Sequence, residues 1–93
     1  IHLKDFYIRK KEQLPDQTEM FNCNKGSWFE TMGGKMIRGS ILGQGDMDIW
    51  EILKTIKHSD FDGYISLEFE GMEPCEQGTE IGLAMARAIL DKV

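Results

Sequence analysis

Two strand-like stretches, each followed further along the chain by a helix-like stretch, most constrain what this sequence can fold into. The first strand pattern covers residues 1–5 and the second covers residues 64–69, and in both the side chains alternate between two faces. Apolar residues recur on one helical face over residues 49–56, and again from about Thr79 to Lys92. The order strand, helix, strand, helix favours a parallel sheet covered by helices.

A capped turn is expected before the first helix. Either Asp46 or Asp48 can accept a hydrogen bond from the first turn of that helix. The stretch Gly43-Gln44-Gly45-Asp46 lacks both the GxxxxGK[ST] pattern and the full GxGxxG pattern of phosphate-binding loops, so we interpret it as the turn that enters the helix. His58 lies at the expected helix end, where a cation is favoured, and is interpreted as structural.

The segment between the first strand and this turn has no sustained periodicity. Residues 6–33 are mostly polar, so we expect a long connection that leads to a short extended piece at residues 35–42. The basic run Arg9–Lys11 is followed at once by an acidic residue and is interpreted as a solvated loop. Trp28 and Phe29 lie in the same connection, where they either cover a pocket or tie the loop down.

Charge and cysteine content exclude several classes of protein. The net charge of −5 argues against binding to nucleic acid, which requires clustered Lys and Arg. Cys23 and Cys75 are too few for a secreted disulfide scaffold and have no CxxC spacing, which favours reduced thiols in a cytoplasmic protein. No run approaches the roughly 18 apolar residues of a membrane span. We therefore expect a cytoplasmic protein that binds neither nucleic acid nor a membrane; a homo-oligomer is compatible with the sequence.

Two strands do not form a stable sheet alone, and parallel strands are normally buried on both faces. Since residues 1–93 supply only two confident strands and begin without Met, we expect them to be the C-terminal piece of a longer protein.

Polar side chains near the carboxyl ends of the two strands are the candidates for a site. By strand parity, His2 and Lys4 point to the same side as Glu68, whereas Asp5 alternates away from it. An imidazole and a carboxylate on adjacent strands are a suitable half-site for a divalent cation. The structural alternative is that His2 is a hydrogen-bonded strand residue and that Glu68 is a solvated carboxylate.

Three motifs carry a resemblance to a known superfamily: IHLKD at residues 1–5, GQGDMDIWEIL at 43–53 and DGYISLEFEG at 62–71. In this order they resemble the C-terminal end of the xylose-isomerase-like TIM barrels, which include sugar phosphate isomerases and epimerases. The resemblance implies an α/β fold that forms the last two strand–helix units of a (β/α)8 barrel, with parallel strands. Residues 1–93 would then be the C-terminal segment of a single domain, in a chain of roughly 250–320 residues whose remaining part completes the barrel.

The resemblance also implies roles for individual residues. His2 and Glu68 would be two of the metal ligands, and Glu68 would also be one of two catalytic carboxylates. Arg38, five residues before Gly43, is similar in position to an arginine that contacts the substrate. Lys4 would bind substrate or pair with Glu68. The cofactor implied is a divalent metal ion, with Mn, Mg or Co preferred and Zn as a further option.

The function implied is a metal-dependent isomerase or epimerase of a small sugar or sugar phosphate, an enzyme of carbohydrate metabolism. It would move a proton next to a carbonyl through an enediolate. Two alternatives stay open: a dehydratase of a keto-inositol or related polyol on the same scaffold, and a barrel remnant without catalysis. The DNA-repair endonuclease branch is not favoured, because its Asp-x-His zinc pair is absent: the chain has no His between His2 and His58.

Overall fold

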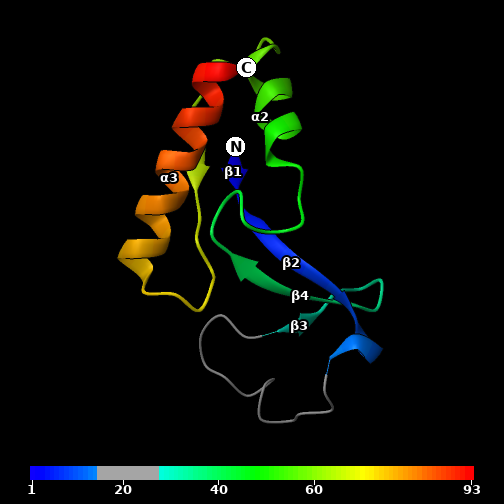
Figure 1. Cartoon of the computed structure of the whole chain (residues 1–93). Coiled ribbons are helices and arrows are strands. Elements are labelled where there is room, and N and C mark those ends of the chain that lie inside the picture. The colour runs from blue at the N-terminus through cyan, green and yellow to red at the C-terminus, as the bar shows by residue number, and fades with distance from the viewer. Residues whose placement is uncertain (15–27) are drawn as a thin grey trace.

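The computed structural model describes residues 1–14 and 28–93, which form two small β-sheets and two α-helices (Figure 1). The expected mixed α/β class is therefore confirmed. In chain order the elements are β1 (His2–Leu3), β2 (Asp5–Lys10), the 3-10 helix η1 (Lys11–Gln13), β3 (Phe29–Glu30), β4 (Lys35–Ser40), α2 (Ile49–Lys57), β5 (Ser66–Leu67) and α3 (Cys75–Lys92).

Strands β1 and β5 are parallel neighbours, as the strand–helix order predicts. His2 pairs with Ser66 and Leu3 pairs with Leu67, and the amide of Glu68 donates to the carbonyl of Leu3 at 3.0 Å. Both strands are shorter than expected, because the paired register covers only two residues in each of them.

The second sheet is antiparallel, with the strand order β2–β4–β3, and it was not expected. Strand β2 pairs with β4 along its whole length, from Asp5 opposite Ser40 to Lys10 opposite Lys35. The prediction of a loop from residue 6 onward was therefore wrong for β2, η1 and β3. The basic run is not a loop either: it forms the exposed end of β2 and the start of η1, where charged side chains remain in water. The extended piece predicted at 35–42 is confirmed for residues 35–40, which form β4, whereas Ile41 and Leu42 lead into the following turn.

One apolar core joins the two helices to the β1–β5 pair. Figure 1 shows α2 and α3 on either side of the N-terminal strand, and α3 contacts both α2 and β5. Leu53 on α2 has no exposed surface, which marks the centre of this core. The buried members are Leu3, Leu42, Ile49, Leu53, Ala86 and Ile89, with Ile52, Ile65, Leu67, Leu90 and Val93 packed against them.

The helix ends follow local chemistry. Asp48 caps α2, where its side chain accepts a hydrogen bond from the Glu51 amide at 3.0 Å, and His58 is the C-cap residue, as expected. Helix α3 begins at Cys75 rather than near Thr79. Pro74 occupies its N-cap position, where the fixed φ of proline suits a helix start.

The two described parts of the chain do not by themselves form a closed barrel, since β1–β5 and β2–β4–β3 are separate sheets. The (β/α)8 architecture and the parallel partners beyond β1 and β5 stay predictions. Neither helix in the described residues combines the length and the apolar character needed to cross a membrane.

Candidate functional site

The face of the β1–β5 pair that turns away from the core carries a group of charged and polar side chains. We call His2, Lys4, Glu68 and Glu70 the polar cluster. Leu3 and its partner in β5 belong to the core, so strand alternation turns the residues beside them to the other face. The parity argument thus placed His2, Lys4 and Glu68 on the correct side.

Each carboxylate oxygen of Glu68 has its own partner. His2 Nδ1 lies 2.5 Å from Glu68 Oε1, and Lys4 Nζ lies 2.9 Å from Glu68 Oε2. The same ammonium group lies 2.8 Å from Glu70 Oε1. Lys4 therefore bridges two carboxylates, while one oxygen of Glu68 faces the imidazole.

Charge pairing sets the protonation of the cluster. The hydrogen bond from Lys4 lowers the pKa of Glu68, and the charges of Lys4 and His2 act in the same direction against the effect of burial. Hydrogen bonds to Glu70 and Glu68 raise the pKa of Lys4. At neutral pH Glu68 is thus a carboxylate and Lys4 an ammonium ion. About a third of each of these two side chains is exposed (33% and 34%), so water screens their attraction.

His2 and Glu68 supply an imidazole nitrogen and a carboxylate oxygen, two donor types that Mn, Co and Zn accept. At 2.5 Å these two atoms are in direct hydrogen-bond contact, so they would have to separate to admit an ion between them. Lys4 occupies only the other oxygen of Glu68, so metal binding at Oε1 would leave the Lys4 hydrogen bond in place. Within the described residues, no group of three or more His, Cys, Asp or Glu side chains is arranged to hold a metal ion. Any complete site needs further ligands from outside these residues.

Arg38 lies on β4 and is not a member of the polar cluster. Its guanidinium carbon is 4.9 Å from the centroid of the Tyr7 ring and 5.4 Å from that of Trp28, which is a double cation–π arrangement. Nη1 lies 3.7 Å from Met72 Sδ, and Nε is buried without a hydrogen-bond partner among the described residues. The aromatic rings therefore hold the side chain while leaving nitrogen donors uncommitted.

Strand β4 lies directly against the segment that follows β5, which carries Glu70 and Met72. A Cβ atom at Gly39 would overlap the backbone carbonyl of Glu70 and would lie 2.9 Å from the Gly71 nitrogen. Our sequence reasoning missed Gly39, although a glycine inside a strand pattern is a known sign of close backbone approach. This contact places the strand of Arg38 beside the segment that carries Glu70, one member of the polar cluster.

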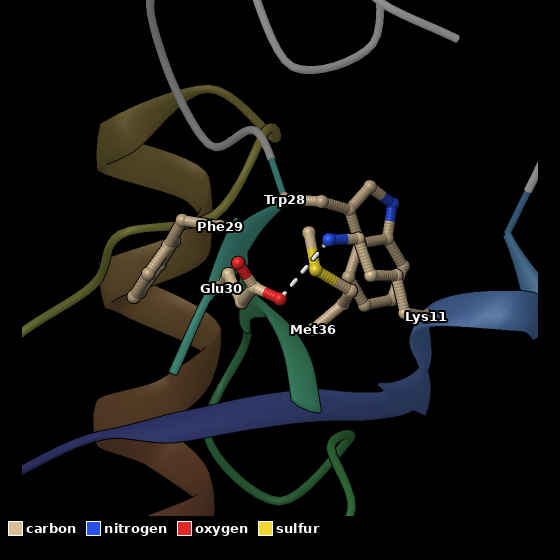
Figure 2. A pocket seen from close by; sticks show the side chains of 5 residues that line it. All are labelled: Lys11, Trp28, Phe29, Glu30 and Met36. Atoms are coloured by element: carbon tan, nitrogen blue, oxygen red, sulfur yellow. Dashed lines mark hydrogen bonds and ion pairs between the residues drawn. The ribbon is translucent and has the colours of Figure 1, made fainter. Parts of the chain in front are cut away.

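A separate pocket of about 280 Å³ lies at the far end of the antiparallel sheet, lined by Lys11, Trp28, Phe29, Glu30 and Met36. Figure 2 shows the ion pair between Lys11 and Glu30, with an Nζ–Oε1 distance of 3.2 Å. Trp28 is buried, lines this pocket and makes a cation–π contact with Arg38, which agrees with its interpretation as a pocket residue. The lining of this pocket is mostly apolar.

Cys75 does not belong to the polar cluster. Cys75 is a free, exposed thiol at the start of α3, and Cys23 lies outside the described residues.

Comparison with known proteins gives no relative: the chain matches no family model, no curated protein and no solved structure. The xylose-isomerase-like assignment therefore stays a prediction that rests on the sequence motifs.

Proposed function

We propose that the protein is a metal-dependent isomerase or epimerase of a small sugar or sugar phosphate. The observation that carries this proposal is the contact between His2 Nδ1 and Glu68 Oε1 on the polar face of two parallel neighbours. In the proposed (β/α)8 barrel, the carboxyl ends of such strands form the mouth in which catalytic groups gather.

His2 and Glu68 would hold the metal ion together with ligands from the remaining part of the barrel. A bound divalent ion would supply Lewis-acid polarisation of the substrate carbonyl. His2 would bind through Nδ1, the nitrogen that faces Glu68.

Glu68 would carry the proton that moves next to the carbonyl. The hydrogen bond from Lys4 lowers the pKa of Glu68, so Lys4 keeps the Glu68 carboxylate ionised and able to accept a proton. A second carboxylate from outside the described residues would return the proton.

Arg38 would contact the substrate at the edge of the site. Cation–π contacts with Tyr7 and Trp28 hold its guanidinium group, and such a group suits a phosphate or several hydroxyl groups. The contact of Arg38 with Met72 directs it toward the segment after β5.

Metal binding is the first test, because it needs no knowledge of the sugar. We expect the intact protein to bind Mn²⁺, measured by the electron paramagnetic resonance signal of the free ion. His2→Ala and Glu68→Gln should each weaken binding by more than the roughly 10–100-fold that loss of an outer-shell partner costs. His58→Ala and Glu73→Gln are matched controls that should bind normally. Equal binding by all four variants would refute the proposed ligands.

Turnover is the second test. The protein is incubated in D₂O with Mn²⁺, Mg²⁺ or Co²⁺ and a panel of aldoses, ketoses and their phosphates. We expect deuterium to enter the carbon next to the carbonyl, and Glu68→Gln to abolish this exchange. A product that has lost water would identify the dehydratase alternative. Absence of both metal binding and exchange would favour the barrel remnant without catalysis.

A further inference from the structure

Asp5 is a buried carboxylate whose hydrogen-bonding capacity is filled by backbone donors. Only 3% of the residue is exposed. Its Oδ1 accepts from the amides of Phe6 (2.8 Å) and Met47 (3.2 Å), and its Oδ2 accepts from those of Gly43 and Gly45, both at 2.9 Å. Four donors offset the cost of burying the charge. The carboxylate therefore fastens the turn at residues 43–47 to the beginning of β2.

The turn is shaped to fit this carboxylate. Gly43 adopts a φ of +88°, which favours glycine. A Cβ atom at Gly45 would overlap the Asp5 carboxylate and the Ser40 hydroxyl, and would lie 2.6 Å from the Phe6 carbonyl oxygen. Any side chain at Gly45 would push Asp5 out of its place.

Lys4 is the single residue between β1 and β2, and its backbone is fixed on both sides. On one side, Leu3 is buried and paired with Leu67 of β5. On the other side, Asp5 is held by the turn and paired with Ser40 of β4. The backbone position of Lys4 therefore depends on two anchors.

We propose that Asp5 is a positioning residue: by fastening the turn at residues 43–47 to the start of β2, it holds the backbone that aims the Lys4 ammonium group at Glu68 and Glu70. The importance of this aim for catalysis rests on the proposed function, but the effect of Asp5 on Lys4 does not.

Asp46 offers a matched comparison. It ties the same turn to β2 further from Lys4, because its amide donates to the Phe6 carbonyl and its carboxylate accepts from Ile8 and Arg9.

The test compares the reactivity of lysines in the intact protein without substrate. Trace acetylation followed by mass spectrometry gives the rate at Lys4 relative to exposed Lys54, which serves as an internal reference. A paired ammonium group reacts slowly, so Asp5→Asn should increase the relative rate at Lys4 several-fold, because an amide cannot accept all four backbone hydrogen bonds. Asp46→Asn should leave the ratio unchanged. If the Asp5→Asn variant folds and its acetylation rate at Lys4 relative to Lys54 equals that of the wild type, then Asp5 stabilises the turn without positioning Lys4, and the proposal is wrong.

A second variant and a measurement on the unaltered protein cover the case in which Asp5→Asn does not fold. Gly45→Ala displaces the Asp5 carboxylate and should increase the relative rate at Lys4 in the same direction. In the wild-type protein, urea below the unfolding range should raise hydrogen exchange at the Gly43 and Gly45 amides and acetylation at Lys4 together. If hydrogen exchange at these amides rises while the acetylation rate at Lys4 stays the same, the turn and the Lys4 side chain are not coupled, and the proposal is wrong. None of these measurements uses a sugar or a metal, so failure of the proposed function leaves their outcome unaffected.

Discussion

Lys4 Nζ lies 2.9 Å from Glu68 Oε2, although the two residues are 64 positions apart in the sequence. They meet because β1 and β5 are parallel neighbours, and Lys4 directly follows β1 as Glu68 directly follows β5. This pair determines the protonation of the one carboxylate that also touches His2.

Replacing Lys4 should change the titration of Glu68. Lys4→Met removes the hydrogen bond that lowers the pKa of Glu68, so this pKa should rise toward its ordinary value of 4.5. Carbon-13 NMR of the labelled carboxyl group measures the change, and Lys54→Met is the control. An unchanged midpoint would show that Lys4 does not hold Glu68 in solution.

The same pair should make stability depend on pH at both extremes. The pKa of Glu68 is lowered by folding, so its stabilisation is present above the unfolded value near 4.5 and is lost as pH falls through the folded value. The pKa of Lys4 is raised, so its stabilisation is present below 10.5 and is lost as pH rises through the folded value. The urea midpoint of unfolding, measured at acid, neutral and alkaline pH, should vary less in Lys4→Met than in the wild type. The same pH dependence in both proteins would contradict the pairing of Lys4 with Glu68.

Gly39→Ala should destabilise the protein. The added methyl group would overlap the backbone of Glu70, so either β4 or the segment after β5 must move. We expect a loss of about 1–3 kcal/mol in the free energy of unfolding, measured by urea denaturation. Gly33→Ala is the control, because the nearest atom to its Cβ would be Thr31 Oγ1 at 3.9 Å. Equal stability of the two variants would argue against close packing at Gly39.

Leu53→Ala should be among the most costly core substitutions. The residue has no exposed surface and lies within the cluster that joins α2, α3 and β1, so truncation leaves a cavity. The expected loss is about 2–5 kcal/mol in the free energy of unfolding, measured by denaturation with urea. Leu83→Ala on α3, where 39% of the residue is exposed, should lose much less.

Local patterns predicted the elements that depend on local signals. The β1–β5 pair, the capped start of α2 at Asp48 and the common side of His2, Lys4 and Glu68 all follow from periods of 2 and 3.6 residues and from capping chemistry. The periods and the helix cap are signals within a few neighbouring positions of the sequence, whereas the parallel pairing of β1 with β5 follows from the order of strands and helices.

Other features depend on partners that are distant in sequence. Strand β2 carries charged residues at its exposed end and becomes a strand only through its pairing with β4. Strand parity correctly predicted that Asp5 points away from the polar cluster. It did not indicate that backbone amides of the turn at residues 43–47 donate hydrogen bonds to the Asp5 carboxylate. The bridge from Lys4 to Glu70 likewise requires the course of the chain after β5.

The pairing of Asp5 with Ser40 has a consequence for how this protein can vary. The chain leaves the parallel pair after Lys4 and returns at Ser40, so the intervening segment starts and finishes at adjacent points. Doubling the length of a flexible loop between such points costs only about 0.6 kcal/mol. Arg38 pairs with Tyr7 close to these points, so insertions, deletions or exchanges further out in the segment would leave Arg38 as well as His2, Lys4 and Glu68 in place. The length of the segment can therefore vary without disturbing the polar cluster.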